Sequence, residues 1–340
     1  MLNKADIHAF GELLSTPKKI IALSHVNPDG DAIGACLALQ HSLTAKGHQV
    51  TLVAPNRFPE FLQWMPGASG ILIYKEHKHK VQRLLTEAEL VICVDFNDLQ
   101  RIDDLGAFVL NTPAKRALID HHLEPDKNTF DFLFWGTDFC SSAEVVYHLL
   151  KELYRQDAIS TIVASTIYAG IMTDTNDFRN NCSNPNIFET VADLIRCGID
   201  KDKIHSEVYD NYTEDRLRLM GYALHEKLVV LPHYRAAYIA LSKQELTQFN
   251  HQIGDTEGFV NFPLNIKGIV LSAFFTETQD NIRVSFRSKG EFSVNDFARA
   301  HFMGGGHKNA AGGKLSTTMN EAVEFFKQAL QKYKDELLAS

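Results

Sequence analysis

The 340-residue sequence has no long uninterrupted apolar stretch. Its apolar runs fall well short of the ~20 residues that a helix needs to span a bilayer, so we expect no membrane segment and no membrane partner. The amino terminus carries Lys4, Asp6 and His8 where a secretory signal would need an unbroken apolar core. These absences predict a cytoplasmic protein.

Cysteine is sparse, and its distribution excludes two kinds of site. The five cysteines are scattered along the chain without close pairing. Neither a disulfide framework nor a zinc site built from thiolates is therefore expected. We interpret the cysteines as small buried apolar residues.

Positive charge is also in short supply. Lysine and arginine together number 34 against 42 aspartates and glutamates, which gives a formal net charge of −8 at pH 7. A surface of that sign should repel polyanions, so we do not expect a groove for long or duplex nucleic acid. A small phosphorylated ligand is compatible with it. The dense basic run at residues 75–80 is predicted to be a solvated loop or helix face.

The rest of the composition is typical of packed globular domains, with 45% apolar and 22% charged residues. Because 340 residues exceed the usual size of a single core, two domains are expected. Over residues 1–190, apolar strand segments and a helical pattern that stops at Gly47 predict an α/β fold with a parallel sheet flanked by helices. The predicted strands are residues 19–24, 49–54, 90–94 and 117–119.

The second half of the chain predicts a smaller domain. Residues 191–227 are polar and helical in pattern and are predicted to form a connector. Residues 228–340 are predicted to form a mixed α/β domain. Its expected elements are strands at 236–241, 268–275 and 281–287, then a glycine-rich loop, and finally an amphipathic helix at 320–338.

Acidic and histidine residues follow three of the predicted strands directly. His25, Asp29 and Asp31 come after the first strand, Asp95 after the third, and the run 120–122 (Asp-His-His) after the fourth. In open parallel sheets, ligands bind beyond the carboxyl ends of the strands, so these side chains are expected to converge. Alone, the Asp-x-Asp pattern would fit an ordinary helix N-cap equally well.

Asp174 follows the apolar run 162–172, which is predicted to be a buried helix. Burying a carboxylate is unfavourable unless its negative charge is neutralised, and a bound metal ion would neutralise it. Asp177 competes for that role, but Asp174 lies closer to the apolar run. Carboxylates mixed with imidazoles and no thiolate suit manganese or magnesium, with zinc and iron left open.

Together these motifs resemble those of the DHH phosphoesterase superfamily. The resemblance implies two divalent ions bridged by Asp95, with His122 facing the substrate phosphate and Asp120 supporting the ligating histidine. Two such ions can activate a water molecule for attack on phosphorus, which fits the absence of a Gly-x-Ser-x-Gly nucleophile motif. The implied ligands are His25, Asp29 and Asp95 for one ion, and Asp31, Asp95, His121 and Asp174 for the other.

Two features of the predicted second domain indicate phosphate contacts. In the strand at 281–287, Arg283 and Arg287 alternate with apolar residues, so they should share one face. The run 304–307 (Gly-Gly-Gly-His) would allow close backbone approach to a phosphate. An ordinary half-buried strand and a flexible glycine turn are the alternatives that these patterns leave open.

These features resemble the DHH-associated carboxyl-terminal domain. That resemblance implies nucleotide contacts by Arg287, His307 and the backbone of Gly305 and Gly306, and strand alternation adds Arg283.

The two-domain layout is similar to that of the nano-RNases, which are bifunctional oligoribonucleases and phosphoadenosine phosphate (pAp) phosphatases. The resemblance implies degradation of short RNA oligonucleotides to mononucleotides and removal of the 3′-phosphate of pAp. Hydrolysis of cyclic or linear dinucleotides, such as cyclic di-AMP and pApA, is one alternative, and pyrophosphate or polyphosphate hydrolysis is another. An inactive nucleotide-binding regulator is an alternative of a different class. A homodimer is compatible with the sequence.

Overall fold

The computed structural model describes residues 2–155 and 159–339 and divides the chain into two compact units, Met1–Asn211 and Tyr212–Ser340. The division falls inside the segment 191–227 that the sequence predicts as a connector. Within the described residues, no helix is both long and apolar enough to cross a membrane.

The first unit contains a six-stranded sheet in which every neighbouring pair of strands is parallel. The prediction of a parallel sheet is confirmed. The strand order is β3-β2-β1-β4-β5-β6, so the strands that precede the acidic and histidine motifs are adjacent at its centre. The strands are β1 (Lys19–Leu23), β2 (Gln49–Ala54), β3 (Leu72–Ile73), β4 (Leu90–Val94), β5 (Lys115–Asp120) and β6 (Phe132–Trp135).

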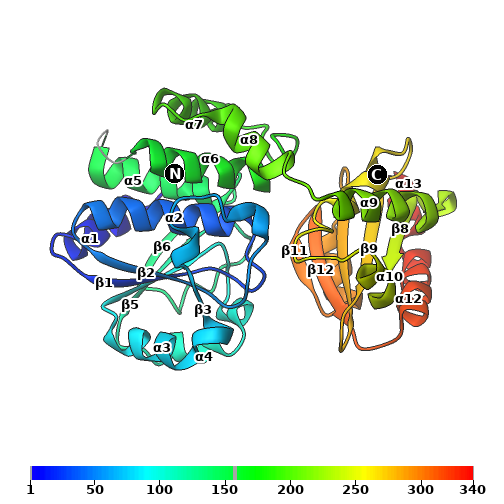
Figure 1. The fold of residues 1–340 in the computed structure, drawn as a ribbon, viewed down its shortest axis with the longest axis horizontal. Helices are drawn as coiled ribbons and strands as arrows, with labels where there is room; N and C mark the ends of the chain where they lie inside the picture. Colours follow the sequence, from blue (N-terminus) through cyan, green and yellow to red (C-terminus); the bar gives the residue numbers. More distant parts are fainter. Residues whose placement is uncertain (1, 156–158, 340) are drawn as a thin grey trace. The chain divides into compact units, whose positions relative to one another are not determined.

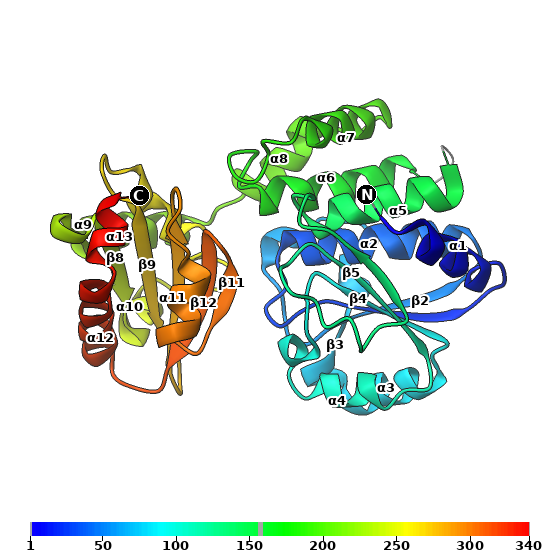
Figure 2. The ribbon, with the colours of Figure 1, turned by 180° about the vertical axis from the view of Figure 1, so that it is seen from behind.

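Helices cover both faces of this sheet, as Figures 1 and 2 show. Helices α3 and α4 pack on one face, and α1, α2 and α5 lie on the other, with α6 packed against α2 and α5. The basic run 75–80 lies on α3 and its residues are exposed, so it is the predicted solvated helix face. The helices are α1 (Lys4–Leu13), α2 (Gly30–Ala45), α3 (Tyr74–Glu87), α4 (Leu105–Leu110), α5 (Ser142–Tyr154), α6 (Thr161–Asp174), α7 (Pro185–Arg196) and α8 (Lys201–Tyr209).

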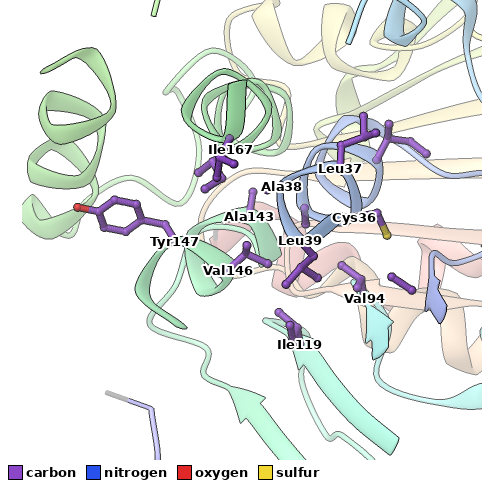
Figure 3. Packing of buried hydrophobic residues seen from close by; sticks show 14 of the residues in the cluster. Cys36, Leu37, Ala38, Leu39, Val94, Ile119, Ala143, Val146, Tyr147 and Ile167 are labelled. Carbon is purple, nitrogen blue, oxygen red and sulfur yellow. The ribbon is translucent and has the colours of Figure 1, made fainter. Parts of the chain in front are cut away.

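The central strands are apolar along their whole length because both of their faces are buried. In β1, Ile20 and Ala22 face the core beneath α2, whereas Ile21 and Leu23 face the core beneath α3. Figure 3 shows Val94 of β4 and Ile119 of β5 close to residues of α2 and α5. A continuous apolar run is the pattern that a doubly covered parallel strand requires.

Helix α6 packs closely against α2 at Gly34 and against α5 at Gly170. A Cβ atom added at Gly34 would lie 2.5 Å from the carbonyl oxygen of Thr166, and one added at Gly170 would lie 2.6 Å from the Cβ atom of Ala143. Because α2 carries Asp31 and α6 ends at Asp174, this contact sets the spacing of two acidic side chains.

The second unit contains a mixed six-stranded sheet of order β11-β12-β10-β9-β8-β7. Strands β8 and β9 are parallel, and the other pairs are antiparallel. The predicted mixed α/β architecture is confirmed. The strands are β7 (Leu228–Leu231), β8 (Ala236–Leu241), β9 (Leu271–Glu277), β10 (Ile282–Ser288), β11 (Gly305–His307) and β12 (Ala310–Leu315).

Each face of this second sheet has its own apolar core. One core is rich in phenylalanine and joins the sheet to α11, α12 and α13, and the other joins it to α9, α10 and the 3-10 helix η6. The helical elements are α9 (Glu214–Glu226), α10 (Lys243–Gln248), η6 (Phe259–Asn265), α11 (Val294–His301), α12 (Met319–Lys332) and α13 (Lys334–Ala339).

Two predictions for the second unit are wrong in detail. The glycine-rich segment is not a loop, because β11 pairs with β12 in a tight hairpin. Its glycines are needed for close packing: a Cβ atom at Gly304 would collide with the carbonyl oxygen of Gly312, and one at Gly306 with that of Ala310. The predicted helix at 320–338 is two helices, α12 and α13, which meet at Tyr333.

A pair of glycine substitutions tests the α2–α6 contact. Alanine favours helix at either site, but at Gly34 its methyl group has no room, so Gly34→Ala should lower the free energy of unfolding by about 1–3 kcal/mol. Gly221 on α9 is the control, because none of the described atoms would lie within 4 Å of a Cβ added there. Gly221→Ala should raise the free energy of unfolding by about 0.5–1 kcal/mol. Urea denaturation measures both, and shifts of the same sign would contradict the close contact.

Candidate active site

Three neighbouring strands deliver the candidate residues to one edge of the first sheet. His25 lies two residues beyond β1, Asp95 directly follows β4, and Asp120 is the last residue of β5. Because β1 pairs with β4 and β4 with β5, these carboxyl ends are adjacent. His121 and His122 continue from β5, and both are buried.

The start of α2 adds two carboxylates. Asp29 is the N-cap of this helix, and its Oδ1 accepts hydrogen bonds of 3.1 Å from the backbone N–H groups of Asp31 and Ala32. The same oxygen lies 3.8 Å from Nε2 of His25, so Asp29 both caps the helix and faces the histidine. Asp31, in the first turn of the helix, is completely buried.

Asp95 is at the centre of the cluster. Its Oδ2 lies 3.3 Å from Nε2 of His25, and its Oδ1 lies 3.5 Å from Nε2 of His121 and 3.7 Å from Nδ1 of His122. Its backbone has a φ of 66°, a left-handed conformation that is strained for a residue with a side chain and is often found at functional sites. Asp95 belongs to three groups of side chains that could each hold a metal ion.

Of the two competing aspartates near the end of α6, only Asp174 reaches this cluster in the structure. Its Oδ2 lies 3.6 Å from Nε2 of His121, which in turn lies 3.9 Å from Oδ2 of Asp31. Asp177 is exposed and instead lies 3.8 Å from His205. The turn after α6 directs the two aspartates to different surroundings.

The imidazole rings are oriented as metal ligands would be. Nδ1 of His25 lies 2.9 Å from the carbonyl oxygen of Val26 and can donate its proton there. In the neutral ring, that hydrogen bond favours the tautomer in which Nε2 carries the lone pair, and Nε2 is the atom that faces Asp29 and Asp95.

The cluster has an excess of buried negative charge. Burial, followed by the charges of Asp95 and Asp174, raises the pKa of Asp31 well above its usual value. Burial is also the main reason that the pKa of Asp174 rises to about 6. Burial alone would lower the pKa of His25, but Asp29 and Asp95 together raise it to about 10. A cation bound among these groups would compete with protons for the same donor atoms.

The Asp120–His122 pair corrects one expectation. Oδ1 of Asp120 accepts a hydrogen bond of 2.8 Å from Nδ1 of His122, whereas the sequence predicted that Asp120 supports the ligating His121. The two histidines are consecutive, so a sequence pattern cannot tell which ring turns back toward the carboxylate. The indole N–H of Trp135 also donates to the carbonyl oxygen of His122 at 2.5 Å, and no sequence signal indicated this contact.

The sequence reasoning also missed the amino terminus of α5. The hydroxyl group of Ser142 donates to Oδ1 of Asp95 at 2.9 Å, and the backbone N–H groups of Ser142 and Ala143 donate to Asp31. A signal for it was present, because Ser141 and Glu144 have the Ser-x-x-Glu spacing of a helix start just before an apolar run.

The candidate phosphate contacts of the second unit share one face of its sheet. In β10 the predicted alternation is observed, with Arg283 exposed, Arg287 partly exposed and the intervening apolar residues buried. Arg287 and His307 are both paired with Ala310 in the strand register, so their side chains lie on the same side of the sheet. Gly305 and Gly306 belong to the adjoining strand β11.

Comparison with known proteins identifies both parts of the chain. Residues 19–171 match the model of the DHH family, N-terminal domain, and residues 236–335 match that of the DHHA1 domain. The chain is 30% identical over 301 residues to the bifunctional oligoribonuclease and PAP phosphatase NrnA of Bacillus subtilis, covering 87% of this chain and 89% of that protein.

Solved structures are similar over nearly the whole chain. The crystal structure of an exopolyphosphatase-related protein from Bacteroides fragilis is 42% identical, with a TM-score of 0.94 and coverage of 99% of this chain and 98% of that one. RecJ from Thermus thermophilus, crystallised with Mn²⁺, shares the fold at 14% identity and a TM-score of 0.57, covering 99% of this chain and 56% of that one.

Thermal unfolding with and without Mn²⁺ tests whether the carboxylate and histidine cluster binds a cation. It also tests whether Asp174 or Asp177 contributes to that binding. A cation that binds only the folded state at a concentration 100 times its Kd adds about 2.7 kcal/mol to the free energy of unfolding. We expect Mn²⁺ to raise the Tm of the wild type and of Asp177→Asn, and to raise that of Asp174→Asn much less. If Mn²⁺ raised the Tm of the two variants equally, Asp174 would not be a ligand of the cation.

Proposed function

Because the chain belongs to the DHH family of phosphoesterases, with a DHH domain followed by a DHHA1 domain, we propose that it hydrolyses the phosphate esters of very short nucleotides. It would degrade short oligoribonucleotides to mononucleotides and remove the 3′-phosphate of pAp, the two activities in the name of its Bacillus relative. The observation that carries this proposal is the buried carboxylate of Asp95, which is shared by three groups of potential cation ligands.

We assign two divalent cations to the cluster. One would be held by His25, Asp29 and Asp95. The buried oxygen and imidazole donors, without any thiolate, favour Mn²⁺, with Mg²⁺ as the alternative. When bound, two such cations supply Lewis-acid chemistry, lowering the pKa of a water molecule and neutralising charge on the phosphoryl oxygens. The second cation would be held by Asp31, Asp95, His121 and Asp174.

His122 is proposed to contact the substrate. Its Nδ1 donates to Asp120, so its Nε2 is the nitrogen that we assign to the scissile phosphate. Asp120 would hold the ring in this orientation during the reaction. The second oxygen of Asp120, Oδ2, is buried and has no hydrogen-bond partner among the described residues, which suits a carboxylate that must stabilise a developing imidazolium.

The DHHA1 domain is proposed to bind the nucleotide end of the substrate. Arg287 and His307 lie on one sheet face with only the small side chain of Ala310 between them in the strand register. A guanidinium and an imidazole on either side of a small residue can both donate hydrogen bonds to one phosphate group, so they form a suitable phosphate-binding site. Gly305 and Gly306 would provide backbone approach, and Arg283 would add positive charge further along the strand.

A second candidate function is hydrolysis of polyphosphate, which the name of the exopolyphosphatase-related Bacteroides protein favours, with pyrophosphate as a smaller substrate of the same kind. The nucleotide substrate is preferred because the DHHA1 sheet supplies an arginine and a histidine on one face. Cyclic or linear dinucleotides such as cyclic di-AMP and pApA would use the same chemistry.

A substrate panel distinguishes these functions. With Mn²⁺ present, the wild type should release phosphate from pAp and mononucleotides from the shortest of a series of RNAs faster than it hydrolyses cyclic di-AMP or pyrophosphate. Asp95→Ala should reduce every rate to below about 1% of wild type, because both cations lose a shared ligand. Faster turnover of pyrophosphate or cyclic di-AMP would replace the proposed substrate, and an active Asp95→Ala would refute the assigned cluster.

Substitution of Arg287 tests the role of the DHHA1 domain. Losing one charged hydrogen bond to a phosphate weakens binding by about ten- to a hundredfold, so Arg287→Ala should raise the KM for pAp and dinucleotides by that factor. Slow hydrolysis of bis-p-nitrophenyl phosphate should change little, because that ester has no nucleotide to hold.

Arg283→Ala is the matched control for this experiment. It removes the same charge from the same face of β10, four residues away. A smaller effect than that of Arg287→Ala is expected. Equal losses in the two variants would indicate general electrostatic attraction, and an equal loss on both substrates would place Arg287 in a purely structural role.

A further inference from the structure

The first turn of α5 points its backbone donors at Asp31. The N–H of Ser142 donates to Oδ2 of Asp31 at 2.6 Å, and the N–H of Ala143 donates to its Oδ1 at 2.8 Å. The first N–H groups of a helix have no partner within the helix, and the helix dipole favours a negative charge beside them. The start of α5 therefore binds a carboxylate that is completely buried and lies among other carboxylates.

The side chain of Ser142 makes a separate contact with the central carboxylate. Its hydroxyl group donates to Oδ1 of Asp95 at 2.9 Å. That oxygen is the one near His121, at 3.5 Å, while Oδ2 is the one near His25, at 3.3 Å. The bond from Ser142 thus opposes rotation of the carboxylate group and keeps each oxygen directed toward a different histidine.

The start of α5 is itself held firmly. The hydroxyl of Ser141 caps the helix by accepting from the N–H of Glu144 at 3.1 Å, and Glu144 accepts from the N–H of Cys140 at 2.7 Å. Figure 3 shows Ala143 of α5 beside α2 in the apolar core. The absence of a side chain at Gly170 permits this approach, because a Cβ there would lie 2.6 Å from that of Ala143 and 3.1 Å from Oδ1 of Asp31.

We propose that Ser142 is a positioning residue for the cation cluster. Its hydroxyl group sets the orientation of the Asp95 carboxylate so that each oxygen faces a different histidine, while the amides of the same turn hold Asp31. This inference rests on the proposed two-cation function, and it assigns to Ser142 no contact with substrate. Groups that orient metal ligands typically change metal affinity by about 10- to 100-fold when they are removed.

Calorimetric titration of the metal-free full-length chain with Mn²⁺, without substrate, tests the proposal. Ser142→Ala should keep its fold, as judged by thermal unfolding, but bind Mn²⁺ about 10- to 100-fold more weakly. Ser142→Thr retains a hydroxyl at the same position and should recover much of the affinity. Ser141→Ala is the matched control, because it removes the neighbouring hydroxyl that caps α5 and has its hydrogen bond with Glu144. It should lower the Tm with little change in Mn²⁺ affinity.

The outcomes separate this inference from the proposed function. Wild-type Mn²⁺ affinity in Ser142→Ala would overturn the positioning role even if the enzyme hydrolyses short nucleotides as proposed. An equal loss of affinity in Ser141→Ala would also overturn it, because the effect would then come from the helix start. Weakened binding in Ser142→Ala alone, in a protein that fails to cleave the substrate panel, would support the positioning role and refute the proposed substrate. A wild type that binds no Mn²⁺ would overturn both.

Discussion

The structure of the first unit depends on confining several carboxylates to one buried place. Asp31, Asp95 and Asp174 come from two helices and a strand end. Burial, followed by mutual repulsion, raises the pKa values of Asp31 and Asp174. Removing charge from water is unfavourable unless it is paired or hydrogen-bonded. The fold meets this requirement with His25 and His121 on the strand ends and with the amide groups of α5.

The same requirement explains local features that would otherwise only reduce stability. The left-handed backbone at Asp95 is strained, yet it turns the chain sharply beyond β4 and keeps the carboxylate at the sheet edge. Gly34 and Gly170 allow α2, α5 and α6 to converge, and the first turn of α5 then donates two backbone hydrogen bonds to Asp31. The close packing of these three helices thus fixes the positions of the acidic side chains. A methyl group added at either glycine would disturb the packing and the positions of those side chains.

In the second unit, the candidate residues are positioned by strand pairing. Its glycines serve the close packing of the hairpin β11–β12, and the row formed by His307, Ala310 and Arg287 results from strand pairing. A phenylalanine-rich core fills the opposite face of β10, so the polar face is carried on a rigid base. Rigid support of polar groups reduces the conformational entropy lost when a ligand binds.

The sequence alone determined which residues are candidates and roughly where the strands lie, because apolar periodicity and strand ends are local properties. His25, Asp95 and His121 were identified in this way, as was the alternating face of β10. Tertiary structure decided which partner each group takes. The pairing of Asp120 with His122 depends on it, and so does the bond from Ser142 to Asp31, 111 residues away in the chain. The sequence already favoured Asp174 over Asp177, but its position beside His121 depends on tertiary structure. Such contacts are set by the packing of helices that are distant in sequence, and no local pattern encodes them.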